Sequence, residues 1–272
     1  MQFFDAHTHV HFPAYDADRE DVFRRAKEAN VKMITVGTQF STSRGAVEYA
    51  KKHPGDVWAT VGFHPTHFSK NWYHDKNEQK GSEREEFNTT ELKKLTILPE
   101  VVAIGECGLD FFRDKSEETK NSQKEAFLKH IEIAHEVKKP LMIHCRAAFN
   151  DLIETLSSQF SLLSSRPGII HFFSGTKDEA KKLLDMGFAF TFGGVVTFTH
   201  DYDDVIKMLP PEAILSETDA PYVAPVPYRG KRNEPAHVVE VVKKLAEIKG
   251  VNTEEMAAKI FENAKRVFAL KV

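Results

Sequence analysis

The alternation of short apolar runs with longer helical segments is the feature that most constrains this chain. Eight runs rich in β-branched or aromatic residues recur along its 272 residues, and each is followed by a segment with helical periodicity. Repeated βα units build a mainly parallel sheet, and eight of them close a (β/α)8, or TIM, barrel of ~250 residues. The expected strands are Phe3–Ala6, Val31–Gly37, Val57–Gly62, Val101–Cys107, Leu141–Cys145, Ile169–Phe173, Phe188–Phe192 and Ala213–Thr218.

The segments between these runs predict helices, with two more after the last strand. The expected helices are Asp18–Asn30, Ser41–His53, Glu117–Val137, Ala147–Phe160, Thr176–Met186, Glu234–Lys249 and Thr253–Phe268. No linker separates the units, so we expect a single domain over residues 1–272. One irregular, polar stretch, Phe68–Thr90, lies between the third strand and its helix. Loops of this length are either solvated surface insertions or lids near a site, and both interpretations are open.

The composition excludes several classes of protein. With 41% hydrophobic and 28% charged residues the chain can bury a full core, which excludes a disordered or fibrous protein. A formal net charge of -3 gives no surface-wide positive field, so any anion-binding patch must be local. Two cysteines, an N-terminus without a signal-peptide pattern and the lack of a long apolar run predict a cytoplasmic protein with no membrane contact. Nothing indicates an obligate protein partner.

Polar side chains gather where the expected strands end. The active site of a (β/α)8 barrel lies at the carboxyl-terminal ends of its strands. Histidine, of which the chain has 13, is the commonest metal ligand. The polar residues at these ends include His7, His9, His64, Glu106, His144, His171 and Asp219. We therefore expect a metal site at one mouth of the barrel.

His7 and His9 form a His-x-His pair, which chance alone would produce about 0.6 times in a chain of this composition. Residues i and i+2 of an extended segment share a face, so both rings could chelate one ion. A turn with two exposed histidines is the alternative. His11 continues the alternation but lies beyond the strand, just before Pro13, and we expect it not to be a ligand.

Glu106 follows an apolar strand, where burying an ionised carboxylate without a partner would be costly. A cation is the simplest partner, and an ion pair with an arginine such as Arg146 is the alternative. A glutamate can also bridge two metals through its two oxygens. Cys107 and Cys145 each directly follow a predicted ligand, so strand alternation turns them toward the helices, where we expect them to pack as small hydrophobic residues.

Four imidazoles and two carboxylates are enough to hold two divalent ions. The predicted ligands are His7, His9, Glu106, His144, His171 and Asp219. Two ions about 3.5–4 Å apart can stabilise both the attacking and the leaving oxygen of a displacement, which points to hydrolysis. Asp219 is then either a ligand or the general base that takes a proton from water. The ligand set suits Zn or Mn and tolerates Mg, so the metal's identity stays open.

The motifs around these residues resemble the TatD family of metal-dependent deoxyribonucleases, in the amidohydrolase-like superfamily. The resemblance runs from Phe3 to the C-terminal helix, and its motifs are Asp5–His9, Gly62–Pro65, Ala103–Asp110, Ile143–Arg146, His171–Gly175, Glu217–Tyr222 and Arg232–Pro235. Two departures bear on substrate preference. Phe68–Thr90 is longer than the family's usual connection, and Phe172 stands where the family more often has a small residue or cysteine.

The resemblance implies a (β/α)8 barrel, DNA as substrate and metal-dependent exonuclease activity. One implied ion is held by His7, His9, Glu106 and Asp219, and the other by Glu106, His144 and His171. His64 is implied to contact the scissile phosphate.

The sequence also offers candidates for holding a nucleic acid. A basic cluster with Arg229, Lys231 and Arg232 follows the Asp219 strand, and together with His64 and Arg146 it could meet backbone phosphates. A solvated loop is the alternative for the cluster. The aromatic residues Phe63, Phe111, Phe112, Phe172 and Tyr222 flank the predicted ligands and could either stack unpaired bases or pack in the core.

We hypothesise a divalent-metal-dependent DNase, a 3′-5′ exonuclease on single-stranded DNA ends that uses a two-metal-activated water. Asp219, Glu106 and His64 are its expected catalytic residues. A second hypothesis keeps the metal site but changes the bond to an ester or amide, including an aminoacyl-tRNA ester. A third is a binding or scaffolding protein whose metals only stabilise the barrel.

Overall fold

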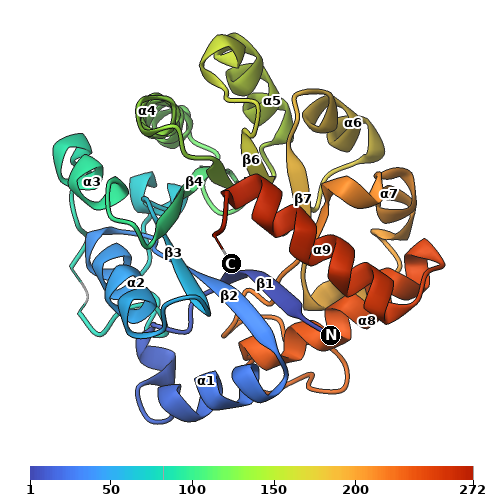
Figure 1. The fold of residues 1–272 in the computed structure, drawn as a ribbon. Coiled ribbons are helices and arrows are strands. Elements are labelled where there is room, and N and C mark those ends of the chain that lie inside the picture. The colour runs from blue at the N-terminus through green and yellow to red at the C-terminus, as the bar shows by residue number, and fades with distance from the viewer. Residues whose placement is uncertain (82, 272) are drawn as a thin grey trace.

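A computed structural model describes residues 1–81 and 83–271 and confirms the (β/α)8 barrel. Figure 1 shows the strands at the centre of the molecule and the helices in a ring around them. All neighbouring strands pair in parallel, in chain order. The strands are β1 Phe3–Thr8, β2 Val31–Val36, β3 Val57–Val61, β4 Val101–Asp110, β5 Leu141–Arg146, β6 Gly168–Ile170, β7 Ala189–Phe192 and β8 Ile214–Ser216.

The seven expected helices are present in the described residues, and the structure adds two that the periodicity did not indicate, at Thr89–Thr96 and Asp203–Met208. Two expected helices match residue for residue. These are α4, which spans Glu117–Val137, and α9, which spans Thr253–Phe268. The other α-helices are α1 Arg19–Glu28, α2 Phe40–Lys52, α3 Thr89–Thr96, α5 Phe149–Ser158, α6 Lys177–Asp185, α7 Asp203–Met208 and α8 Val238–Lys249. Short 3-10 turns are η1 Pro13–Tyr15, η2 Pro65–Phe68, η3 Phe160–Leu162, η4 Gly194–Thr197, η5 Pro211–Ala213 and η6 Pro235–His237.

The boundaries of two strands differ from the expected ones in a way that affects the site. β4 continues three residues beyond Cys107 to Asp110, which adds another carboxylate to the strand end. β6 stops at Ile170 because Phe172 adopts a φ of 45°, which is incompatible with an extended strand. His171 therefore lies just beyond the end of its strand.

The barrel closes between β1 and β8. Thr8 forms a bridge with Ala220, and the Asp219 N–H donates to the His7 carbonyl at 2.9 Å. At the opposite end α9 covers the barrel, where Phe261 packs against Phe4 at the start of β1. The carboxyl-terminal ends of the strands are thus the ends that α9 leaves uncovered.

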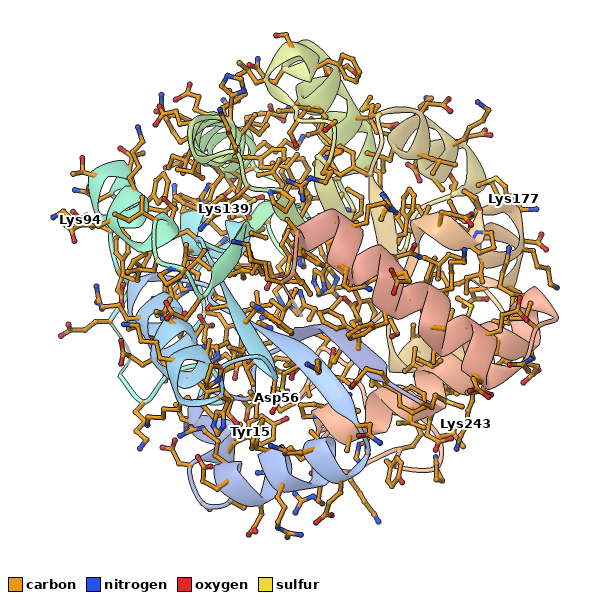
Figure 2. All side chains as sticks on the ribbon, viewed as in Figure 1. Tyr15, Asp56, Lys94, Lys139, Lys177 and Lys243 are labelled. Carbon is orange, nitrogen blue, oxygen red and sulfur yellow. The ribbon has the colours of Figure 1, made fainter. Side chains whose placement is uncertain are left out.

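Large apolar side chains fill the core, and the buried carboxylates such as Glu106 and Glu217 lie at the carboxyl-terminal ends of the strands. Phe4, Ile104 and Phe190 are fully buried, and burying each side chain of this size contributes about 1.5–3 kcal/mol. Figure 2 shows the labelled Lys94 and Lys177 at the periphery, on α3 and α6. No helix in the described part of the chain has both the length and the apolar character that crossing a bilayer requires.

Two strands are irregular where they carry site residues. The register shifts between Asp5 and Thr8 on β1, and again between Ile104 and Cys107 on β4. Bulges of this kind re-aim side chains and are common at barrel rims. β4 also approaches β5 closely at Gly108, where an added Cβ would lie 2.1 Å from the carbonyl oxygen of His144. A side chain at this glycine would separate the two strands that carry Glu106 and His144.

Residues 69–81 of the irregular stretch, which we call the strap, lie beside the barrel mouth. The hydroxyl of Tyr222 donates to the carboxylate of Asp75 at 2.7 Å. Glu78 accepts hydrogen bonds from His67, at 3.2 Å, and from Thr38, two residues after β2. The strap is therefore attached to the strand ends by polar contacts.

Candidate metal centre

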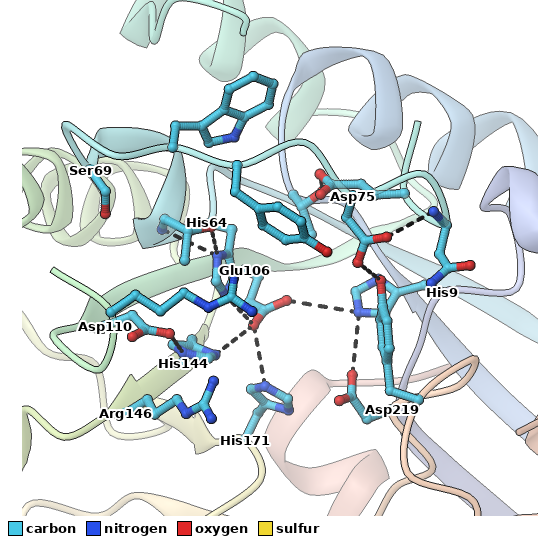
Figure 3. Close-up of a pocket in the computed structure, with 18 of the residues that line it drawn as sticks. His9, His64, Ser69, Asp75, Glu106, Asp110, His144, Arg146, His171 and Asp219 are labelled. Carbon is cyan, nitrogen blue, oxygen red and sulfur yellow. Dashed lines mark hydrogen bonds and ion pairs between the residues drawn. The ribbon is translucent and has the colours of Figure 1, made fainter. Parts of the chain in front are cut away.

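A pocket of ≈ 470 Å³ opens at the carboxyl-terminal ends of the strands. Imidazoles and carboxylates from six different strand ends converge at its floor, and Figure 3 shows them facing one another. The strap runs along its upper edge in this view, between the labelled Ser69 and Asp75. The pocket thus has a floor made by the barrel and a wall made by the strap.

The first donor group is formed by His7, His9 and Asp219. The Nε2 atoms of the two histidines lie 3.1 Å apart, and Asp219 Oδ1 is 3.7 Å from His7 and 3.4 Å from His9. His9 Nδ1 donates to the Val36 carbonyl at 2.8 Å, which leaves the lone pair of Nε2 facing the pocket. Asp219 has a left-handed backbone with a φ of 53°, a conformation that concentrates at functional sites.

Glu106 lies between two sets of histidines. Its Oε2 is 3.4 Å from His7 Nε2, whereas its Oε1 is within 3.1–3.3 Å of ring nitrogens of His64, His144 and His171. Burial alone would raise the pKa of Glu106, but the surrounding histidines hold it well below its usual value. The carboxylate stays ionised, which is the form that binds cations. The alternative partner, Arg146, forms no ion pair with it in the described residues.

His171 is oriented by a carboxylate behind it. Its Nδ1 donates to Glu217 at 3.2 Å, and Glu217 also accepts from the hydroxyl of Thr191. The ring of His171 stacks on that of His7 with centroids 3.8 Å apart. Metal-binding histidines usually donate their other ring N–H to such a carboxylate. This role of Glu217 was not predicted from the sequence, although a glutamate directly after an apolar strand was a signal for it.

Asp110 is a second carboxylate that the sequence analysis missed. Its Oδ2 lies 3.0 Å from His144 Nε2, while His144 Nδ1 faces Glu106. Burial opposes ionisation of Asp110, but the hydrogen bond with His144 lowers its pKa to about 2. Strand alternation was the available signal, since residues 106 and 110 share one face of β4.

His64 lies among the possible ligands. Its Nε2 faces Glu106 at 3.3 Å, and its Nδ1 contacts the hydroxyl of Thr66 at 2.7 Å. The donor atoms of His64, Glu106 and His144 lie within 4.8 Å of one another. The resemblance had implied a phosphate contact for His64 and had grouped Glu106 with both His144 and His171. In the structure Glu106 Oε1 faces both His144, at 3.1 Å, and His171, at 3.2 Å, while its Oε2 faces His7 at 3.4 Å.

These groups fit divalent cations. Their nitrogen and carboxylate donors converge on common points, and imidazoles with carboxylates suit Zn, Mn and Fe while carboxylates and water suit Mg. His11 belongs to none of the three groups in the described residues; its Nδ1 contacts the Thr35 hydroxyl at 2.7 Å. Cys107 and Cys145 are buried in the hydrophobic core, as expected, and also lie outside these groups.

The arginines predicted to hold substrate lie in different places. Arg146 lines the pocket, whereas Arg229, Lys231 and Arg232 do not. Arg232 is bound to Asp18 at 2.6 Å. The pocket is also lined by Arg113, which follows β4 and which the sequence analysis missed because nothing in the local pattern distinguishes it from a surface arginine.

Of the five flanking aromatic residues, two belong to the core and one lines the pocket. Phe63 and Phe111 are buried in the core and are not available to stack bases. Phe112 is 55% exposed, Phe172 is half-buried, and Tyr222 lines the pocket. Seven residues of the irregular stretch line the pocket as well: Ser69, Asn71, Trp72, Tyr73, Asp75, Asn77 and Glu78.

Comparisons with known proteins point to one family. A family model described as TatD related DNase matches residues 4–269. The uncharacterised metal-dependent hydrolase YabD of Bacillus subtilis (strain 168) is 36% identical over 270 residues, which cover 98% of this chain and 99% of the relative. A Pantoea vagans (strain C9-1) protein named 3′-5′ ssDNA/RNA exonuclease TatD is 34% identical over 275 residues, with 98% and 99% covered.

A solved structure shows the same fold. The crystal structure of YJJV, a TatD homologue from Escherichia coli K12, matches with a TM-score of 0.84 at 26% identity, covering 99% of this chain and 98% of that one. The resemblance that the motifs indicated is thereby confirmed. The chain belongs to the TatD family of metal-dependent hydrolases.

Proposed function

We propose that this hydrolase is a 3′-5′ exonuclease that cleaves phosphodiester bonds at single-stranded DNA ends with two divalent cations. The observation that carries the proposal is the placement of Glu106, whose two oxygens face different sets of histidines. A carboxylate in this position can be shared by two cations, the arrangement typical of phosphodiester cleavage. The name of the Pantoea vagans relative supports the choice of substrate and direction.

The residues of this chain have distinct tasks in the proposed reaction. Bound cations would lower the pKa of a coordinated water and neutralise charge on the phosphate. His7, His9, Glu106, His144, His171 and Asp219 hold them. Asp219 turns Oδ1 toward His7 and His9, while its Oδ2 has no partner in the described residues. Burial opposes its ionisation, but His9 keeps its pKa below the usual value, so Oδ2 is an ionised base that accepts the proton from water.

Two groups at the pocket orient the phosphate. His64 directs Nε2 toward Glu106 and the pocket, and the guanidinium of Arg146 forms no ion pair in the described residues. A planar guanidinium can bind two phosphate oxygens at once. The pocket volume of ≈ 470 Å³ is that of a small-molecule site, which suits a terminal nucleotide better than a continuous duplex.

Hydrolysis of an ester or amide, including an aminoacyl-tRNA ester, is the second candidate. One observation favours it: Arg229, Lys231 and Arg232, on which the sequence argument for a phosphate substrate relied, lie outside the pocket lining. The scaffolding hypothesis is not retained, because the chain belongs to a family of hydrolases.

The direct test uses metal-stripped protein on 3′- or 5′-labelled single-stranded DNA, with Mg, Mn or Zn restored one at a time. We expect cleavage only after a metal is added and stepwise shortening from the 3′ end. Glu106→Ala should abolish it, while Glu91→Ala, at an exposed position on α3, should not. DNA cleavage that survives both chelation and Glu106→Ala would exclude the proposal. Hydrolysis of a small ester without DNA cleavage would favour the second candidate.

A further inference from the structure

Two arginine–aromatic pairs stand at the rim of the pocket. The guanidinium carbon of Arg113 lies 4.6 Å from the centre of the Tyr73 ring, and that of Arg146 lies 3.7 Å from the centre of the Phe112 ring. Both arginines line the pocket, and both rings are largely exposed, Tyr73 by 59% and Phe112 by 55%. Large aromatic surfaces held open beside a polar site are typical of ligand-binding positions.

Apart from the expected metal ligands Glu106 and Asp219, the acidic side chains that line the pocket are already engaged in hydrogen bonds, whereas its two arginines pair with no carboxylate in the described residues. Asp110 is bound to His144, Asp75 to Tyr222, and Glu78 to His67. Asp114 accepts from the Ser116 N–H at 3.0 Å and the Thr119 hydroxyl at 2.8 Å.

Neither Arg113 nor Arg146 pairs with a carboxylate anywhere in residues 1–81 and 83–271. Arg25 and Arg232, by contrast, are held by Glu234 and Asp18 at 2.6 Å each. The pocket therefore presents two cations free to bind an anion.

An arginine–aromatic pair can bind both the phosphate and the base of one nucleotide. A guanidinium that lies flat on a ring keeps its edge N–H groups free for phosphate oxygens. The surface of the aromatic ring that the guanidinium leaves uncovered can stack on a base. Such stacking needs an unpaired base whose face is accessible. In a duplex the terminal base is paired and stacked on its neighbour, and a small ester has no base beside its reacting bond.

The position of the two pairs places the nucleotide next to the metal centre. Arg146 ends β5, two residues after His144, and Phe112 and Arg113 follow Asp110 at the end of β4. Tyr73 comes from the strap, which Asp75 attaches to Tyr222. The close-up in Figure 3 shows Arg146 beside His144 and His171.

We propose that Tyr73–Arg113 and Phe112–Arg146 form a subsite for the unpaired nucleotide adjacent to the cleaved bond. The arginines hold its phosphate and the rings hold its base. This inference rests on the proposed nuclease function and specifies that the substrate must be single-stranded at the reacting end.

The test compares a single-stranded oligonucleotide with bis(4-nitrophenyl) phosphate, a small diester that needs only the metal centre. Tyr73→Leu and Arg113→Gln should each raise KM for the oligonucleotide about tenfold, since stacking one base is worth about 1–3 kcal/mol. Turnover of the small diester should stay within about twofold. Phe160→Leu and Arg44→Gln, at exposed positions outside the pocket, are matched controls and should change neither.

Abasic substrates locate the subsite. Three oligonucleotides each carry one abasic residue, at one of the last three positions. For one of them, Tyr73→Leu should raise KM no further, because the base that Tyr73 stacks on is already missing. The inference is overturned if the Tyr73→Leu effect persists at every position, or if the variants slow both substrates equally.

Binding separates this inference from the proposed function. Anisotropy is measured on the Mg-loaded protein with an oligonucleotide whose terminal linkages are non-hydrolysable methylenephosphonates. Tenfold weaker binding by Tyr73→Leu, together with no DNA cleavage by the wild type, would support the subsite and exclude the nuclease. DNA cleavage with unchanged binding, or equal binding of a blunt duplex, would overturn the subsite.

Discussion

The metal centre and the strap face the same pocket but are held in place in different ways. His7 and Glu106 are buried at bulges of the barrel strands, and neighbouring strands fix their positions. The strap depends on a few side-chain contacts, such as Asp75 with Tyr222, and exposes Tyr73. The comparison indicates that the metal-binding side chains are fixed by the barrel itself, whereas the strap, which supplies Tyr73 to the proposed subsite, is attached by polar side-chain contacts.

Replacing Glu106 with Gln is expected to have the largest effect and to affect every substrate. The substitution keeps the shape but removes the charge between the histidine sets, so several kcal/mol of metal-dependent stabilisation should be lost. Hydrolysis of DNA and of bis(4-nitrophenyl) phosphate should both fall roughly a thousandfold. Metal content should fall with them in elemental analysis. Full metal occupancy with unchanged rates would contradict the assignment of the centre.

The buried His130, which packs against the barrel, should make the free energy of unfolding depend on pH. This buried residue of α4 accepts the Phe63 N–H at 3.1 Å, next to His64, and burial lowers its pKa from 6.5 to about 4. The unfolded chain therefore binds a proton between pH 6.5 and 4 that the folded chain does not. The free energy of unfolding should fall by about 3 kcal/mol as the pH decreases through this window.

Urea titrations of the wild type and of His130→Gln at several pH values measure this contribution. The variant should lose less stability than the wild type between pH 6.5 and 4, whatever its stability at pH 8. His200→Gln, at an exposed position, should behave like the wild type. Parallel curves for the wild type and His130→Gln would show that His130 is not the group responsible.

Glu217→Gln is expected to weaken metal binding without emptying the site. The carboxylate accepts from His171 Nδ1 and lies behind the site, so its loss should cost about 10–100-fold in metal affinity. Competition with a coloured chelator gives the affinity, and excess metal should restore most of the activity. Glu212→Gln on η5, where the side chain is exposed, is the matched control. A loss of activity that excess metal does not rescue would argue for a different role.

Tyr222→Phe should have the smallest effect and should act through the strap alone. Removing one hydroxyl breaks the contact with Asp75, worth about 0.5–1.5 kcal/mol. KM for the oligonucleotide should rise about threefold to tenfold, with the small diester unaffected. Hydrogen exchange in residues 69–81 should become faster. Tyr202→Phe, just before α7 and outside the pocket lining, serves as the control. Equal effects on both substrates would remove the distinction between strap and barrel.

The repeat of βα units and the position of ligands at strand ends were accessible from the sequence, because both follow from local periodicity. His7, His9, Glu106, His144, His171 and Asp219 were found in this way, and the structure brings them together. Asp110 and Glu217 carried weaker signals of the same kind. Arg113 carried none, since its importance depends on Tyr73, which comes from the strap 40 residues earlier in the chain.

The sequence by itself thus determined the barrel, the metal-binding character of its mouth and the family. Only the tertiary structure decided that Phe63 and Phe111 belong to the core and that Arg232 is bound to Asp18. It also decided that the strap lines the pocket. The reason is physical: periodicity reports which face of an element is buried, but the contacts of a long irregular segment depend on where the closed barrel places its distant partners.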